Sequence, residues 1–148
     1  MDAVIRFPSK KEVPTILNLL YELGRPRAKE GSNEKFFENL VQKYIEDSDK
    51  QILVAEYETK LVGMVSIVFL PRLNQKSNEM YIPELIVTKN YQNVGIGKKL
   101  INFCIDLAKK ENCHRIRLES GNQRKESHLF YRNLGFSQSA LSFSMEID

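Results

Sequence analysis

The chain has 148 residues, of which 42% are apolar and 28% charged, and its formal net charge is +3. This length suits one domain over residues 1–148, and the composition excludes a disordered chain. The mild, dispersed charge does not indicate nucleic-acid binding, and no apolar run is long enough to span a membrane. Cys104 and Cys113 fit neither a disulfide framework nor a metal motif. Residues 1–6 lack signal-peptide features, so we expect a cytoplasmic protein without a metal.

The first half of the sequence predicts a short strand, two helices and a hairpin. Ser9 and Glu12 fit a capping box before a helix that Gly24 ends. A polar loop and a second amphipathic helix follow. The expected elements are a strand at 3–7, a helix that follows the Ser9 cap and runs up to Gly24, a helix at 34–47, and strands at 51–57 and 60–70 that Glu58 and Thr59 connect.

The second half alternates strands with helices. After a loop over residues 71–78, the expected elements are a strand at 80–87, a helix at 95–111, a strand at 115–120, a helix at 125–133 and one or two closing strands within 136–147. Pro83 interrupts the first of these strands and indicates either a bulge or an edge position, because proline cannot donate to a ladder. The order of elements predicts a mixed α/β sheet domain.

A glycine-containing turn before the long helix is the strongest local signal. Its residues are Gln92, Asn93, Val94, Gly95, Ile96 and Gly97. Glycines let main-chain N–H groups approach a ligand, and the unpaired N–H groups at a helix start favour a phosphate. Lys98 and Lys99 follow in the first helical turn, where a bound anion would offset their repulsion from the helix dipole. A turn that only packs a helix on a sheet is the structural alternative.

Two other phosphate-binding motifs do not fit this turn. A dinucleotide-binding GxGxxG motif needs a third glycine and an acidic residue at a set distance, and both are missing. A P-loop needs Gly-Lys-Ser/Thr after a longer glycine gap, which the turn also lacks.

Residues 92–97 resemble the GNAT superfamily of N-acetyltransferases, whose coenzyme A signature is Gln/Arg-x-x-Gly-x-Gly/Ala at the start of a long helix. Residues 119–122 and 128–136 are similar to the family's second segment, which ends in Phe-Tyr-x-x-x-Gly-Phe. The resemblance implies a largely antiparallel sheet with a splayed central parallel pair and about four flanking helices. It also implies acetyl-coenzyme A as co-substrate, and a homodimer by analogy with many members.

The resemblance places the coenzyme along the strand at 80–87, the turn and the last helix. The implied contacts are the main chain of Leu85, Ile86 and Val87, the turn from Gln92 to Gly97 with Lys98, and the side chains of Asn122, Ser127 and Tyr131. Arg124 is a weaker candidate for the phosphates. An N–H near Ile86 or Val87 would stabilise the oxyanion of a tetrahedral intermediate.

Glu84 and Tyr131 are the expected catalytic residues. An amine must be neutral to attack, so a carboxylate such as Glu84 would act as the base, directly or through water. Tyr131 matches the family tyrosine that acts as general acid toward the leaving thiolate. A salt-bridged strand glutamate and a core tyrosine are the structural alternatives, and His128 is not assigned a role.

The sequence does not identify the acceptor amine. The family binds it through segments that here correspond to 21–33, Phe36, Phe37 and 71–78. Glu22, Glu30 and Glu34 would attract a cation, but Arg25, Arg27 and Lys29 lie among them, so a solvated loop of mixed charge is the structural alternative. The expected function is N-acetylation of a primary amine on a small molecule or peptide, by direct attack. A non-catalytic acyl-coenzyme A binding or regulatory domain is the alternative, and a nucleotide or phosphosugar binder is a weaker third.

Overall fold

The computed structural model describes residues 2–24 and 31–147. The chain divides into two compact units, Met1–Arg117 and Leu118–Asp148. A single domain over the whole chain therefore stays a prediction. The elements in chain order are β1 (Val4–Arg6), the 3-10 turn η1 (Lys10–Glu12), α1 (Val13–Leu23), α2 (Gly31–Glu46), β2 (Lys50–Tyr57), β3 (Lys60–Pro71), β4 (Asn78–Ile82), β5 (Leu85–Val87), the 3-10 turn η2 (Lys89–Tyr91), α3 (Ile96–Lys110), β6 (Arg115–Leu118) and α4 (Lys125–Asn133).

The start and the end of α1 follow the predicted signals. The Ser9 N–H donates to the Glu12 carboxylate at 2.8 Å, and the resulting 3-10 turn leads directly into the helix. Pro14 lies in the first turn, where its missing N–H costs no helical hydrogen bond. Gly24 adopts φ 108°, a left-handed conformation that terminates the helix.

The first unit contains a largely antiparallel sheet with the order β1-β2-β3-β4-β6, and β5 pairs with β3 beyond the end of β4. β4 and β6 form its parallel pair. Glu58 and Thr59 connect β2 and β3 with φ of 48° and 65°, the positive values of a type I′ hairpin turn. The mixed α/β fold predicted from the sequence is therefore confirmed.

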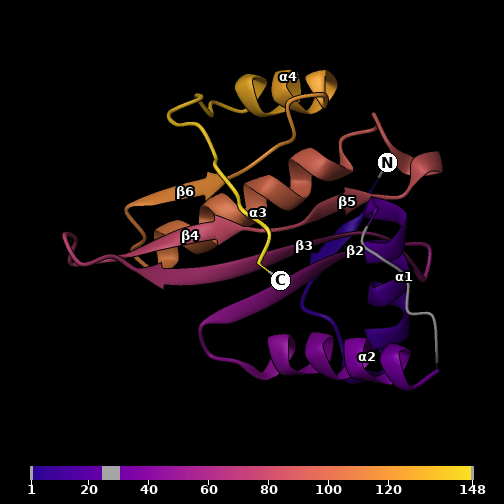
Figure 1. Ribbon diagram of the computed structural model, residues 1–148. Helices are drawn as coiled ribbons and strands as arrows, with labels where there is room; N and C mark the ends of the chain where they lie inside the picture. Colours follow the sequence, from indigo (N-terminus) through magenta and orange to yellow (C-terminus); the bar gives the residue numbers. More distant parts are fainter. Residues whose placement is uncertain (1, 25–30, 148) are drawn as a thin grey trace. The chain divides into compact units, whose positions relative to one another are not determined.

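Helices cover both faces of this sheet, and Figure 1 shows α2 and α3 on opposite sides of β2 and β3. On one face, Ile52, Val54 and Met64 pack in a core cluster with apolar residues of α1 and α2. Gly63, the neighbour of Met64 along β3, lies against Leu100 of α3, as the alternation of side chains in a strand requires. The face that carries Ile52, Val54 and Met64 is the α1/α2 face.

In the second unit, α4 has the predicted bounds, but the closing strands expected within 136–147 are not formed. Apolar residues do alternate there, at Leu141, Phe143, Met145 and Ile147, and all four are exposed. Alternation is only half of what makes a strand, because a strand also needs a hydrogen-bonded neighbour. No such neighbour pairs with residues 136–147 within the described chain, so this expectation was wrong.

Candidate active site

A β-bulge divides the strand expected over residues 80–87 into β4 and β5. Tyr81 pairs with Val68, whereas Leu85 pairs with Val65. Two residues of β3 therefore lie opposite three residues of the β4–β5 segment, which is a one-residue bulge. Pro83 lies within the bulge, where its missing N–H breaks no ladder bond. Of the two readings of Pro83, the bulge is confirmed.

The bulge also ends the pairing on the far side of the segment. β4 pairs with both β3 and β6, but among the described strands β5 pairs with β3 alone. The edge of β5 that faces away from β3 is thus not used by a neighbouring strand. This is the divergence that the resemblance implied for the central pair.

The antiparallel register shows which groups of β5 face this unused edge. Thr88 N–H donates to the Val62 carbonyl at 2.8 Å, so in this ladder the even-numbered residues point their main-chain groups toward β3. The main-chain groups of Leu85 and Val87 therefore point outward, and those of Ile86 point toward β3. The expectation that three successive residues face the coenzyme is corrected to these alternate two.

Gln92 connects the glycine turn to β5. Its side-chain Nε2 donates to the Val87 carbonyl at 2.8 Å, which agrees with the outward direction of that carbonyl. The first residue of the motif thus fixes the distance between the outward edge of β5 and the start of α3. The amide side chain therefore has a structural contact that connects the turn to β5.

The turn itself has the geometry of an anion site. Asn93 and Gly95 have positive φ values of 63° and 93°, while Val94 between them does not. Such alternation directs successive N–H groups into one concavity. Gly95 is the N-cap of α3, and a Cβ built on it would meet no atom within 4 Å, so the space in front of the helix is open. These residues fit a diphosphate, which the free N–H groups and the dipole of α3 would bind.

The two lysines after the turn have different environments. The Lys99 ammonium donates to the Ala3 carbonyl at 2.7 Å and so ties α3 to the start of the chain. Lys98 is exposed beside the turn. The positive charge available to a bound phosphate in this helical turn therefore comes from Lys98.

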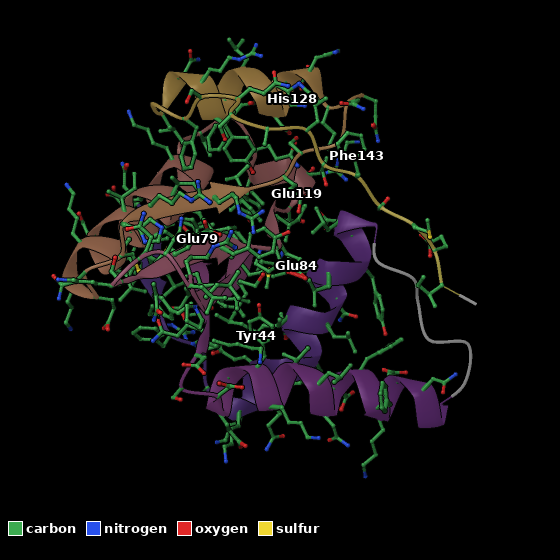
Figure 2. All side chains as sticks on the ribbon, turned by 60° about the vertical axis from the view of Figure 1, so that its left-hand side comes forward. Tyr44, Glu79, Glu84, Glu119, His128 and Phe143 are labelled. Atoms are coloured by element: carbon green, nitrogen blue, oxygen red, sulfur yellow. The ribbon has the colours of Figure 1, made fainter. Side chains whose placement is uncertain are left out.

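Glu84 follows Pro83 in the bulge and is held by Ser66 of β3. The Ser66 hydroxyl donates to Glu84 Oε2 at 2.5 Å, and the Glu84 N–H donates to the same hydroxyl at 3.0 Å. Tyr44 of α2 lies on the same face of the sheet, and Figure 2 shows it between α2 and Glu84. Sequence reasoning missed Ser66 and Tyr44. The available signal was that Ser66 is the one hydroxyl within the apolar run from Leu61 to Leu70.

An ionic cluster on the α1/α2 face joins β4 to β6. The Glu79 carboxylate has no exposed surface, and it accepts hydrogen bonds from Nε of Arg115 and, at 2.8 Å, from Nε of Arg117. The Arg117 guanidinium also lies 4.5 Å from the centre of the Tyr81 ring. Burial raises the pKa of Glu79, but the hydrogen bonds from the two arginines outweigh it, so the net pKa is lowered. The carboxylate therefore stays ionised and connects the two strands.

The acidic residues proposed to attract the acceptor separate into different environments. Both carboxylate oxygens of Glu22 are used, one by the Thr88 hydroxyl at 2.7 Å and one by the Lys89 N–H at 3.1 Å. Glu22 thus holds α1 against the segment after β5. Glu34 is exposed in the first turn of α2, and Glu30 lies outside the described residues.

The aromatic residues considered for the acceptor also differ. Phe36 is 60% exposed on α2, whereas Phe37 packs against the core cluster of the α1/α2 face. Within 71–78, Leu73 is fully exposed. Phe37 is thus a core residue, and Phe36 remains available to a ligand.

In the second unit, Tyr131 is a partly buried residue of α4. The rings of Phe130 and Phe136 pack edge-on against it, with centroid distances of 5.2 and 5.8 Å. Burial raises the pKa of Tyr131, and nearby Arg124 lowers it by less, so the phenol keeps its proton at neutral pH. A protonated phenol is the form that a general acid requires.

The other candidates of this unit lie at the start of α4. Asn122 is exposed in the loop before the helix, and Ser127 is partly buried in its first turn. A ring nitrogen of His128 lies 2.8 Å from the Gly121 carbonyl, which ties the helix to the preceding loop. This structural contact agrees with leaving His128 without a catalytic role.

The described residues contain neither a metal-binding cluster nor a membrane-spanning helix. Over 2–24 and 31–147, no group of three His, Cys, Asp or Glu side chains is arranged to hold a metal ion. In the same ranges, no helix combines the length and the apolar character that crossing a bilayer demands.

Comparisons with known proteins support the fold and identify the family. Over 91 residues the chain is 34% identical to the uncharacterized N-acetyltransferase YhdJ of Bacillus subtilis, which covers 60% of this chain and 63% of that protein. The chain thus spans less than two-thirds of this relative. A transcriptional regulator from Bacillus halodurans has a similar fold, with a TM-score of 0.86, 23% identity, and coverage of 99% of this chain and 100% of that one.

A second similar structure was solved with a ligand. AAC(6′)-Iy, in complex with a bisubstrate analog that contains coenzyme A, superimposes with a TM-score of 0.84 at 13% identity and covers 100% of both chains. At this identity the likeness concerns the fold alone. The profile of the Acetyltransferase (GNAT) family matches residues 16–136, which is most of the chain. This protein therefore belongs to the acetyltransferase (GNAT) family.

Proposed function

We propose that this protein transfers the acetyl group of acetyl-coenzyme A to a primary amine. The observation that carries the proposal is the bulge at Pro83 and Glu84, because one irregularity produces two features of a transferase site. It leaves the outward edge of β5 without a neighbouring strand among the described residues, and it contains Glu84, the residue that directly precedes β5. The family assignment supports the same chemistry.

The coenzyme would bind along β5 and the glycine turn. The N–H groups from Asn93 to Lys98 would hold the diphosphate, with Lys98 adding positive charge. The outward main-chain groups of Leu85 and Val87 would pair with the amides of the pantetheine arm, as a neighbouring strand would. One outward N–H would also donate to the thioester oxygen, and a single well-placed donor of this kind is worth about 3 kcal/mol in the transition state.

Glu84 and Tyr131 would then move the protons. Glu84 takes a proton from the amine, whose lone pair forms the new C–N bond at the acetyl carbon. The C–S bond breaks, and the sulfur receives the proton of the Tyr131 hydroxyl, which gives free coenzyme A and the acetylated amine. Water then carries the proton from Glu84 back to the Tyr131 phenolate, so both residues regain their starting states. Proton transfer by such groups contributes about 10²–10⁴-fold to a rate.

The test combines binding and turnover. Calorimetry should detect acetyl-coenzyme A but not ATP or NAD, and free thiol should appear when spermidine, a lysine-containing peptide or an aminoglycoside is added. Glu84→Gln should lower kcat by at least about 100-fold with alkylamines and leave coenzyme affinity unchanged. Tight coenzyme binding without turnover on any amine would favour the regulatory domain, and absence of binding would refute the whole proposal.

A further inference from the structure

The proposed coenzyme site has two halves, and a short connection over residues 88–92 separates them. One half is the outward edge of β5, which ends at Val87. The other half is the concave part of the glycine turn, which begins at Asn93. A coenzyme that lies along β5 and places its diphosphate at the start of α3 contacts both halves at once. The connection therefore sets the spacing that the coenzyme has to match.

This connection has little structure of its own. Its centre is the three-residue 3-10 turn η2, whose internal hydrogen bonds run from the Tyr91 N–H to the Thr88 carbonyl at 2.9 Å and from the Gln92 N–H to the Lys89 carbonyl at 3.5 Å. Thr88 is the N-cap, but its side chain accepts no hydrogen bond from the turn. A single 3-10 turn is only marginally stable, so contacts from other elements have to hold it.

Glu22 of α1 supplies the missing cap from outside. Its Oε1 accepts the proton of the Thr88 hydroxyl at 2.7 Å, and its Oε2 accepts the Lys89 N–H at 3.1 Å. The Lys89 N–H begins η2 and has no partner within it, because the first internal bond comes from Tyr91. Hydrogen bonds to a carboxylate are stronger than those between neutral groups. One side chain thus replaces the N-cap, although it lies 66 and 67 residues away in the sequence.

The other contacts of the connection hold it to the sheet. The Thr88 N–H donates to the Val62 carbonyl of β3 at 2.8 Å, and the Tyr91 ring packs against the Tyr57 ring of β2 with a centroid distance of 5.9 Å. Gln92 closes the connection on itself through its bond to Val87. Glu22 differs from these contacts because it comes from α1 and carries a charge.

We propose that Glu22 is a positioning residue for the coenzyme, which holds residues 88–92 so that the β5 edge and the glycine turn keep the spacing that one coenzyme molecule spans. The inference rests on the proposed function, because it takes β5 and the turn as the two halves of one coenzyme site. When a ligand has two contact points, a fixed spacing lets the second contact form without a further loss of conformational freedom. Glu22 thus contributes to the affinity for the whole coenzyme and not to the affinity for either half of it.

The charge of Glu22 gives the test a defined sign. A carboxylate in the neighbourhood of a phosphate site repels the ligand, so its removal should by electrostatics alone strengthen the binding of a diphosphate. Positioning predicts the opposite change for the complete coenzyme. The direction of the change in affinity therefore separates the two effects.

Glu22→Gln and Thr88→Val remove the same contact from its two sides, the first with a change of charge and the second without one. Calorimetry would measure the affinity for acetyl-coenzyme A, for 3′-phospho-ADP, which lacks the pantetheine arm, and for S-acetylpantetheine, which lacks the nucleotide. Glu22→Gln should weaken the binding of acetyl-coenzyme A about 5- to 30-fold and Thr88→Val about 2- to 10-fold, while both fragments bind within about twofold of the unaltered protein. The double variant should lose about as much as Glu22→Gln alone, because the two substitutions act on one contact.

Glu111→Gln is the matched control, because it removes the same charge from an exposed side chain at the other end of α3. It should leave all three affinities unchanged. Unchanged or tighter binding of acetyl-coenzyme A in Glu22→Gln, an equal loss for acetyl-coenzyme A and 3′-phospho-ADP, or fully additive losses in the double variant would each overturn the inference and leave the proposed function intact. If Glu22→Gln does not fold, the same comparison of ligands in Thr88→Val decides. If the unaltered protein does not bind acetyl-coenzyme A, the proposed function fails and the inference fails with it.

Discussion

Replacing both Arg115 and Arg117 with methionine would leave the carboxylate of Glu79 buried without its two charged donors. The Glu79 side chain is 0% exposed, so water cannot take their place, whereas the arginine side chains are 50% and 35% exposed. Breaking a buried ion pair from the exposed side in this way costs about 3–5 kcal/mol. For a chain of this size the melting temperature should fall on the order of 10 °C.

The loss should depend on pH in a defined direction. In the unaltered protein the pKa of Glu79 is lowered from its ordinary 4.5, so its stabilisation is present above pH 4.5 and is lost as the pH falls through the lowered value. In the double variant burial alone acts on Glu79 and raises its pKa. The destabilisation by the buried charge is therefore absent below the ordinary pKa of Glu79 and grows as the pH rises through the raised pKa. The difference in unfolding free energy between the two proteins is therefore largest at neutral pH and shrinks under acid conditions.

Urea unfolding followed by circular dichroism at several pH values would measure this difference. Adding Glu79→Met to the double variant removes the buried charge and should recover most of the lost stability, since an apolar replacement of a whole buried cluster is often neutral. A double variant as stable as the parent, a loss independent of pH, or no recovery in the triple variant would each refute the assignment of Glu79 as a buried ionic link between β4 and β6.

Gly97→Trp should abolish acetyl-coenzyme A binding in calorimetry while the melting temperature changes little, because the large side chain would occupy the front of the turn; unchanged affinity would show that the turn is not the phosphate site. Tyr131→Phe should lower kcat more than it raises the KM for the coenzyme, since a general acid acts in the transition state, and equal turnover would remove the residue from the mechanism. The hydrogen bond from Arg6 lowers the pKa of Glu12 to about 2. The stabilisation of the fold by ionised Glu12 is thus present above the ordinary pKa of the carboxyl and lost between about pH 4.5 and 2. Glu12→Gln should therefore lower the free energy of unfolding by about 1–3 kcal/mol at neutral pH and make stability depend less on pH in acid. Burial raises the pKa of the Cys104 thiol to about 12, so a disulfide reagent should modify it only after urea is added.

The sequence predicted the features that depend on neighbouring residues. The capping box at Ser9, the stop at Gly24, the hairpin turn at Glu58 and the start of the long helix after Gly95 all lie where the sequence placed them. Each follows from local backbone preferences or from helical periodicity, which act over about four residues. The family motif belongs to the same class of signal, because its glycines serve one turn.

Contacts between distant residues could not be predicted in this way. The bulge at Pro83 was one of two open readings, and only the register against β3 decided it. That Glu84 meets Ser66, 18 residues away, depends on this register. The contact of Glu22 with Thr88, 66 residues apart, uses a carboxylate that sequence reasoning had offered to the acceptor.

The sequence by itself thus determined most of the helices and strands and predicted where a phosphate would bind, since both depend on short stretches of chain. Only the tertiary structure decided which edge of β5 is unused, which groups orient Glu84, and that residues 136–147 form no strand despite their alternating pattern. The physical reason is that a strand, a bulge or a held carboxylate exists through a partner. That partner is brought close by the fold of the whole chain, and a local pattern carries no information about its register.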